Sequence, residues 1–385
     1  MKILTVNTGS SSVRLEVFSG DGRGHLPSLY RQHYEFTNGA IPESLLDEFI
    51  DRNDLQDIDV TGHRVVHGGS AFTEPCLVDS RVEQEIKKLT PLAPLHNPIS
   101  LAWIRAARKS LGKAVPQVAV FDTAFFRDMP AVASTYALPS SLCKKYQIRR
   151  FGFHGIAHRA MWQRWTESRP DLASGGRVIT LQLGAGCSMT AVQRGKVMDT
   201  SMGFSPLEGL MMATRCGDLD PGIITYLLRQ GDYTPARLET ILNHESGLVG
   251  VSGISADMRK LLQSPQPQAK FAIELFCYRI RKYLGAYLAV LGGVDGIVFG
   301  AGIGEHAPEI RELILKDMDK FGIELDPERN ASSVNGDQRI SAESSAVEVR
   351  VIAVDEARVL AQEAVRLLQI NKTAGPDILS GEAAG

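Results

Sequence analysis

Two stretches of the chain share one order of features: an apolar run, a short turn of small polar residues, and a second apolar or alternating run. The first occupies residues 2–17 with its turn at Asn7–Ser12, and the second occupies residues 178–193 with its turn at Gly184–Ser188. Alternation of apolar and polar side chains is typical of half-buried strands, so each stretch predicts two strands joined by a turn. Their recurrence predicts a duplicated architecture.

The remaining chain alternates between strand and helix patterns, which predicts the α/β class. A third strand at Gly296–Phe299 leads into a glycine-rich turn at Gly300–Gly304 and then into a helix that begins near Pro308. A last strand precedes Asp355, a candidate N-cap. The length of 385 residues fits two or three domains.

We predict four segments. Residues 1–150 form an N-terminal domain that a C-terminal helix at 355–370 completes. Residues 151–354 form a second domain, and residues 371–385 form a flexible tail.

Composition excludes several classes of protein. Lys and Arg number 42 against 44 Asp and Glu, and the net charge of -2 argues against a nucleic-acid surface. The five cysteines are scattered without a CxxC pair, which indicates reduced thiols rather than disulfides or a zinc site. No signal peptide or membrane span is recognisable. A soluble cytoplasmic protein without membrane or nucleic-acid partners is expected.

The three glycine- and serine-rich turns present backbone N–H groups without obstructing side chains, an arrangement that cradles phosphate groups. The turns lie at Asn7–Ser12, Gly184–Ser188 and Gly300–Gly304. None of them contains a P-loop, and Met189 stands where GxGxxG would require its third glycine. A nicotinamide-dependent dehydrogenase is therefore disfavoured.

Isolated polar residues beside glycines or at strand ends are candidates for chemistry, and each has a structural alternative. Arg64 and Arg215 are suited to hold a carboxylate or phosphate, although either could be a surface residue of a turn. His154 lies between two glycines. Asp122 follows an apolar run, which fits a metal ligand or a helix N-cap, and Asp257 with Arg259 fits an exposed ion pair. Together these residues favour phosphoryl transfer, which needs Mg²⁺ and positive charges more than a nucleophile.

The order of these motifs resembles the acetate kinase family from Met1 to about Leu368. The stretches that carry the resemblance are NTGSSS, GHRVVHGG, APLHNP, VFDTAF, FGFHG, DTSMGFSPLEGL, TRCGDLDP, SGLVGVSGISADMR, YLGAY, AGIGE and VIAVDE. The resemblance implies two similar ribonuclease H-like (actin-like) domains flanking a nucleotide cleft, with residues 151–354 as the nucleotide-binding domain. It further implies a homodimer that transfers a phosphoryl group reversibly between ATP and acetate, giving acetyl phosphate and ADP. Mg²⁺ is the implied metal, with Mn²⁺ as an alternative.

The resemblance also implies roles for individual residues. The implied catalytic residues are Arg64, Asp122, His154 and Arg215. The substrate pocket is implied to consist of Arg64, Val66, Leu95, Phe153 and Pro206. The implied nucleotide-binding residues are Arg14, Gln182, Leu183, Gly184, Ala185, Gly186, Asp257, Met258, Arg259, Gly302, Ile303, Gly304, Glu305 and His306. The implied metal-side residues are Asn7 and Glu356, and the latter also fits a carboxylate at a helix N-terminus.

The second turn departs from the family pattern. The family has HLGNG where this chain has Gln182-Leu183-Gly184-Ala185-Gly186, so two polar side chains are replaced. Loss of one or two hydrogen bonds to phosphate would slow turnover. Two alternatives therefore stay open beside acetate kinase activity: a kinase for propionate or another short acyl chain, and a nucleotide-binding homologue with weak or lost catalysis.

Overall fold

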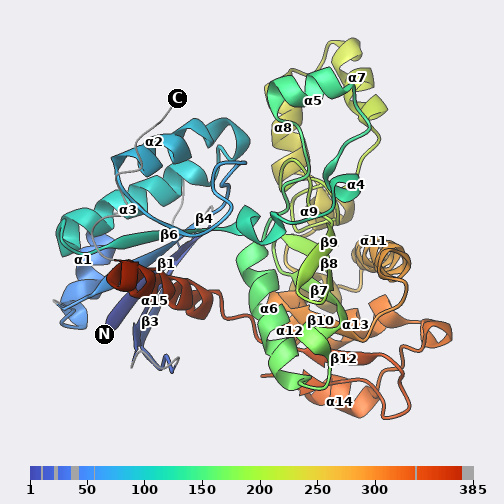
Figure 1. The fold of residues 1–385 in the computed structure, drawn as a ribbon. Helices are drawn as coiled ribbons and strands as arrows, with labels where there is room; N and C mark the ends of the chain where they lie inside the picture. Colours follow the sequence, from blue (N-terminus) through green and yellow to red (C-terminus); the bar gives the residue numbers. More distant parts are fainter. Residues whose placement is uncertain (10–11, 21–24, 36–42, 56, 334–335, 375–385) are drawn as a thin grey trace. The chain divides into compact units, whose positions relative to one another are not determined.

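A computed structural model describes residues 1–9, 12–20, 25–35, 43–55, 57–333 and 336–374. The chain folds into two compact units, of which unit 1 contains Met1–Phe125 and Asp355–Gly385, and unit 2 contains Phe126–Val354. Each unit has one six-stranded sheet (Figure 1). The domain limits expected near residues 150 and 355 stay predictions.

Unit 1 contains six strands and four α-helices among its described residues. They are β1 Lys2–Thr8, β2 Ser12–Ser19, β3 Ser28–Glu35, α1 Glu43–Arg52, β4 Val60–Val65, β5 Cys76–Leu77, α2 Ser80–Lys88, α3 Asn97–Leu111, β6 Gln117–Phe121 and α15 Glu356–Ala374. The strand order is β3-β2-β1-β4-β6-β5. Strands β1 to β3 are antiparallel neighbours, β4 and β6 run parallel to β1, and β5 is antiparallel to β6.

The two faces of this sheet are covered by different helices (Figure 1). Side chains alternate along a strand. Leu4 and Val6 of β1 therefore pack with Trp103 of α3 and Phe49 of α1 in one buried cluster. Helix α15 contacts β1, β4 and β6, where a Cβ atom on Gly62 would lie 2.9 Å from the Leu360 backbone oxygen. This close approach accounts for a glycine inside a central strand.

Unit 2 repeats the pattern of strands. Its elements are α4 Ala131–Ser134, α5 Ser140–Tyr146, α6 Gly155–Ser168, β7 Arg177–Leu183, β8 Cys187–Gln193, β9 Lys196–Thr200, α7 Pro221–Gln230, α8 Pro235–His244, α9 Gly247–Ser252, α10 Met258–Gln263, α11 Pro267–Leu291, β10 Gly296–Gly300, α12 Ala301–His306, α13 Pro308–Leu315, α14 Pro327–Ser332, β11 Gln338–Arg339 and β12 Glu348–Val351. The sheet order is β11-β12-β10-β7-β8-β9. Helices α6 and α11 lie on opposite faces of this sheet (Figure 1).

The two sheets have the same topology, which is apparent when the first order starts at β3 and the second order is reversed to start at β9. In each, three antiparallel strands are followed by two strands parallel to the first and by a short antiparallel edge strand. The expected duplication into two similar actin-like α/β units is thereby confirmed.

Three local expectations need correction. Gly300–Gly304 is mostly not a turn, because α12 begins at Ala301 directly after β10. Arg64 is not a surface residue of a turn, because it lies inside β4 and its side chain is mostly buried. The last helix continues through Ala374, past the start of the expected tail at residue 371. The remaining residues of that tail, 375–385, and Ser10 and Ser11 of the first turn lie outside the described residues.

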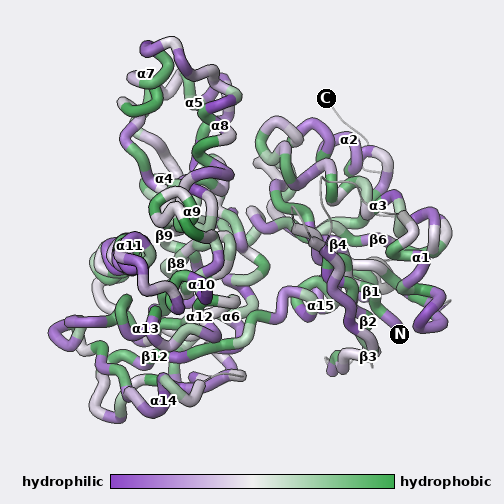
Figure 2. Tube along the Cα trace, turned by 180° about the vertical axis from the view of Figure 1, so that it is seen from behind, coloured by the Kyte–Doolittle hydropathy of each residue, from purple (hydrophilic) through white to green (hydrophobic). Residues whose placement is uncertain are grey.

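Some apolar side chains are exposed on unit 2. Helix α7 buries none of its residues, and its Ile223, Tyr226 and Leu228 are exposed; Figure 2 shows this helix largely in the hydrophobic colour. Within the described part of the chain, no helix is both long and apolar enough to cross a bilayer.

Candidate functional site

In unit 1, Arg64 and Asp122 form a buried ion pair. Arg64 lies on β4, whose neighbour β6 ends just before Asp122. The Arg64 guanidinium donates to Asp122 Oδ2 from Nη2 at 2.7 Å and from Nε at 3.2 Å, and its Nη1 donates to the Thr8 carbonyl at 3.4 Å. The Asp122 side chain is fully buried and that of Arg64 is 13% exposed. The guanidinium is therefore held in a fixed orientation by a paired carboxylate.

The charge state of Arg64 follows from its neighbours. Burial lowers the pKa of Arg64, but the charges of Asp122 and Glu356 and the hydrogen bonding to Asp122 together raise it by more, so the net pKa lies above the usual value. Arg64 is thus a permanent cation that two carboxylates influence.

Asn7 and Glu356 meet at the end of β1 and the start of α15. The Asn7 amide donates to Glu356 Oε2 at 2.6 Å, and Asp355 caps the helix by accepting from the Arg358 backbone N–H at 3.0 Å. The expected N-cap is confirmed. Arg14 lies directly across from Asn7 in the β1–β2 register. These residues thus bring an amide, a carboxylate and a cation to one end of the sheet.

The side chains of Asn7 and Glu356 can be compared with the ligands that a divalent cation requires. Mg²⁺ takes oxygen ligands and is commonly held by one or two carboxylates, with waters and substrate phosphates completing the shell. The Asn7 amide oxygen and the Glu356 carboxylate belong to that ligand class, and their hydrogen bond already brings them together. Among the described residues, no cluster of three or more His, Cys, Asp or Glu side chains offers a metal site made of protein alone.

In unit 2, His154 precedes α6 and has a left-handed backbone conformation, with φ 58°. This conformation is uncommon for a residue with a side chain and is typical of functional sites. The His154 Nδ1 atom lies 2.9 Å from the Ser188 hydroxyl on β8. The preceding Phe153 is buried.

Gly186, in the β7–β8 turn, brings His154 and Arg215 close to one point. A Cβ atom on Gly186 would lie 3.0 Å from His154 Cε1, 3.1 Å from His154 Nε2 and 3.8 Å from Arg215 Nη1. The absence of a side chain at Gly186 therefore leaves room for both donors. Within the turn, Ala185 is exposed.

Two further contacts shape this loop. The Arg215 Nη1 group donates to the Pro206 carbonyl at 3.0 Å. Gln182 precedes the turn, and its Oε1 atom is buried without a hydrogen-bond partner among the described residues. An unsatisfied buried polar atom is uncommon in a folded protein, and Gln182 shares this feature with buried side chains such as Trp103 and Tyr287.

The segment Gly302–His306, which is expected to bind the nucleotide, forms most of α12. The Glu305 carboxylate accepts from the Ala301 backbone N–H at 2.8 Å and from that of Val354 at 3.1 Å. This carboxylate therefore accepts a hydrogen bond from the first backbone N–H group of its own helix. Its contact with a nucleotide stays a prediction.

Arg311 on α13 supports the other end of α12. Its guanidinium is fully buried and donates to the carbonyls of Gly304 and Glu305 at 2.8 and 2.9 Å, and also to Asn330 and Ser333. Burial lowers the pKa of Arg311 to about 10, against a smaller opposing effect of Glu309. Sequence reasoning missed Arg311, because nothing local marks it.

Replacing Arg311 by leucine is expected to lower the free energy of unfolding by about 3–5 kcal/mol, because several buried carbonyl and amide oxygens lose their donor. Urea unfolding followed by circular dichroism would measure the change. Arg237→Leu is the control, since Arg237 is half-exposed and pairs with Glu245 on the surface. Equal urea midpoints for the two variants would contradict this prediction.

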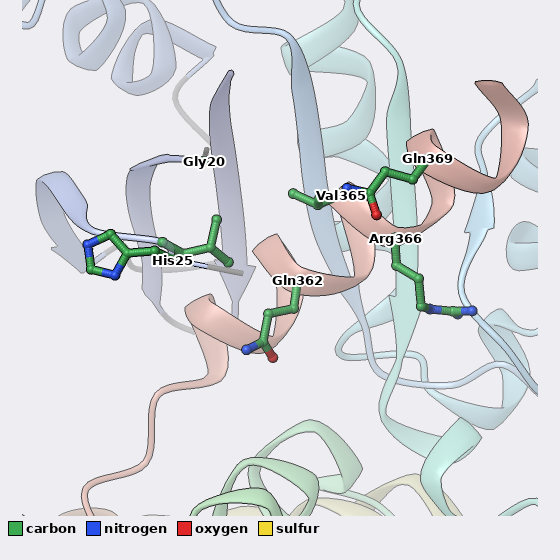
Figure 3. A pocket seen from close by; sticks show the side chains of 7 residues that line it. Gly20, His25, Gln362, Val365, Arg366 and Gln369 are labelled. Atoms are coloured by element: carbon green, nitrogen blue, oxygen red, sulfur yellow. The ribbon is translucent and has the colours of Figure 1, made fainter. Parts of the chain in front are cut away.

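The residues predicted for the substrate pocket are divided between the two units. Val66 is buried and Leu95 is 45% exposed in unit 1, whereas Phe153 and Pro206 belong to unit 2. Asp257 caps α10 and pairs with the exposed Arg259, so these two residues form the exposed ion pair that the sequence also suggested. A cavity of about 190 Å³ in unit 1, lined by His25, Gln362, Arg366 and neighbours (Figure 3), contains none of the predicted residues. The pocket and nucleotide roles stay predictions.

The chain is similar to known proteins over most of its length. The acetokinase family model matches residues 30–362. An acetate kinase of Dictyoglomus turgidum is 41% identical and covers 96% of this chain and 98% of its own length. Among solved structures, Porphyromonas gingivalis acetate kinase is 34% identical with TM-score 0.86, covering 95% of this chain and 99% of its own. A propionate kinase of Francisella tularensis is 33% identical with TM-score 0.84 and the same coverages.

Proposed function

The chain belongs to the acetokinase family, and from this premise we propose how its residues transfer a phosphoryl group from ATP to acetate. The reaction is the reversible formation of acetyl phosphate and ADP by an ATP:acetate phosphotransferase. The observation that best supports these roles is that Arg64, His154 and Arg215, three donors suited to a phosphoryl group, are each held by a specific partner.

The reaction requires that charge repulsion between the two substrates be offset, and it requires no proton transfer from acetate. A carboxylate such as acetate is ionised at neutral pH and needs no general base. Its approach to a polyanionic triphosphate is opposed by charge repulsion. Preorganised donors offset that repulsion and stabilise the charge of the phosphoryl group during transfer. In our proposal Arg64 and Arg215 hold the acetate carboxylate and the phosphoryl group, and His154 donates to a phosphoryl oxygen.

Asp122 is proposed as a positioning residue. Its carboxylate is fully buried and hydrogen-bonds Arg64 through two guanidinium nitrogens. Such a pair fixes the plane and direction of the guanidinium. Asp122 therefore acts through the orientation of Arg64.

Phosphotransferases of this family generally use a divalent metal. We propose Mg²⁺, with Mn²⁺ as an alternative, and place it near Asn7 and Glu356. The metal would neutralise phosphate charge. The chain's own contribution is the hydrogen bond between these two residues, which holds the carboxylate in place before any ligand arrives.

A kinase for propionate or another short acyl chain is the first alternative, because an acetate kinase and a propionate kinase resemble the chain almost equally. One methylene group changes binding by only about 1–3 kcal/mol. The second alternative is a nucleotide-binding homologue with weak or lost catalysis, since Gln182 and Ala185 replace polar residues of the family turn. The retention of Arg64, Asp122, His154 and Arg215 favours a working kinase.

Acyl phosphate formed from ATP and Mg²⁺ can be trapped as the hydroxamate, with acetate, propionate and butyrate compared side by side. We expect product with acetate. Pyrophosphate in place of ATP would test the choice of donor. ATP binding without product from any acid would favour the homologue with lost catalysis.

A homodimer is proposed on the exposed apolar residues of α7, with a second copy of the chain as the partner. Ile223 and Tyr226 are 42% and 61% exposed. Sedimentation is expected to give twice the chain mass, and Ile223→Asp with Tyr226→Asp should yield monomers. A monomeric wild-type protein would contradict this proposal. The cytoplasmic location and the absence of nucleic-acid and membrane partners stay predictions.

A further inference from the structure

A chain of buried hydrogen bonds leads from the interior of unit 2 to His154. Thr180 Oγ1 on β7 lies 2.7 Å from His158 Nδ1, and His158 Nε2 lies 2.8 Å from Ser188 Oγ. The same Ser188 oxygen lies 2.9 Å from His154 Nδ1. Resting on the proposed role of His154, we propose that Thr180, His158 and Ser188 are positioning residues that fix His154 as the tautomer with its proton on Nε2.

The number of protons in the chain leaves two arrangements. Ser188 has one hydroxyl hydrogen, so it can donate to only one of the two histidines. His158 is fully buried, and burial lowers the pKa of His158 to about 3. It is therefore neutral and has one N–H. Among the described residues, the two histidine rings are the partners of the Ser188 hydroxyl, so its hydrogen goes to one ring and its oxygen accepts from the other. The hydrogen bonds of the chain therefore run in one direction or in the other.

The distances around Thr180 select the direction. If His158 were protonated on Nδ1, the Thr180 hydroxyl would have to donate to the Thr190 carbonyl, which is 3.5 Å away. That distance is at the limit for a hydrogen bond, whereas 2.7 Å to His158 Nδ1 is favourable. Thr180 therefore donates to His158 Nδ1, and His158 Nε2–H donates to Ser188.

Ser188 then donates to His154 Nδ1, which leaves the His154 proton on Nε2. The Nε2 end of this ring is next to Gly186 and Arg215, as the position of a Gly186 Cβ atom shows. The relay thus directs an N–H donor toward the turn expected to meet phosphate. The His154 ring is neutral in this tautomer, so it does not repel the positive charge of Arg215. A donor fixed in advance needs no reorganisation during phosphoryl transfer.

The tautomer can be read directly from ¹⁵N chemical shifts of full-length protein labelled on histidine, without substrate. The His154 signals are assigned by their loss in His154→Asn. We expect a bare Nδ1 and a protonated Nε2 at neutral pH. A proton on Nδ1, or on both nitrogens, would overturn the proposal. Because this readout needs no turnover, it stays decisive if the proposed kinase activity itself fails.

Kinetics supply the second readout. Ser188→Ala is expected to lower kcat about tenfold, with the KM for ATP and acetate nearly unchanged, because the donor is still present but no longer oriented. His158→Gln keeps an amide donor for Ser188 and should retain much more activity than His158→Leu. The matched control is Thr190→Val, which removes a buried hydroxyl of the same strand that pairs with Thr200. A loss in Ser188→Ala no greater than in this control would overturn the proposal.

Discussion

Replacing Asp122 by asparagine is expected to lower kcat by about 10²–10³-fold while the KM for acetate changes little. The asparagine removes the charge that fixes Arg64 through two guanidinium nitrogens but leaves the guanidinium itself in unit 1. Arg64 then attracts acetate at least as strongly, since a neutralising carboxylate is gone. It no longer holds one orientation, so stabilisation of the transferring group is lost. Initial rates over a matrix of acetate and ATP concentrations would separate the two effects.

Unit 1 contains a matched control for this variant. Glu16 is buried on β2 and accepts from Arg31 Nε and Nη2 at 2.9 and 2.8 Å, a similar paired geometry in the same sheet. Glu16→Gln removes this ion pair, which contains none of the predicted site residues, and is expected to leave kcat unchanged. If acetate binding collapsed in Asp122→Asn while turnover survived, Asp122 would be a substrate-binding group rather than a positioning residue.

Local patterns predicted most of what depends on neighbouring residues. The strands on either side of the first and second turns, the capping role of Asp355 and the start of a helix at Pro308 were all readable. The glycine-rich segment after β10 was read as a turn because Gly302 and Gly304 oppose helix formation. The Glu305 carboxylate at its start and Arg311 at its end stabilise a helix there instead. Arg311 belongs to the next helix, so a local pattern could not reveal its effect.

The candidate site shows the same division. The residue types at Arg64 and Asp122 were identified from motifs, but their ion pair joins positions 58 residues apart and depends on parallel strand pairing. The relay behind His154 was missed entirely. His158 stands four residues after His154, which places it one helical turn away, and this spacing was the available signal. Ser188 and Thr180 lie near these histidines only because β7 pairs with β8 and packs against α6.

Replacing Arg215 by alanine is expected to lower kcat by about 10²–10³-fold, because a preorganised cation beside His154 and Gly186 is removed. Arg215→Lys keeps the charge but not the planar fork, so it should retain intermediate activity. Guanidinium ion added to Arg215→Ala should restore part of the rate. A purely structural role would not produce such rescue, and steady-state rates with and without guanidinium chloride at constant ionic strength measure it.

The control for Arg215 must also lose a guanidinium that donates to a backbone carbonyl. Arg281 on α11 does so, since its Nε donates to the Ile314 carbonyl at 3.0 Å, the same distance as from Arg215 Nη1 to the Pro206 carbonyl. Arg281→Ala should therefore share any cost of an unpaired carbonyl without losing the charge beside His154, and its kcat should stay near the wild-type value. Equal losses of kcat in the two variants, without guanidinium rescue, would mean that Arg215 supports its loop instead of the phosphoryl group. A loss confined to Arg215→Ala would instead place its positive charge in the chemical step.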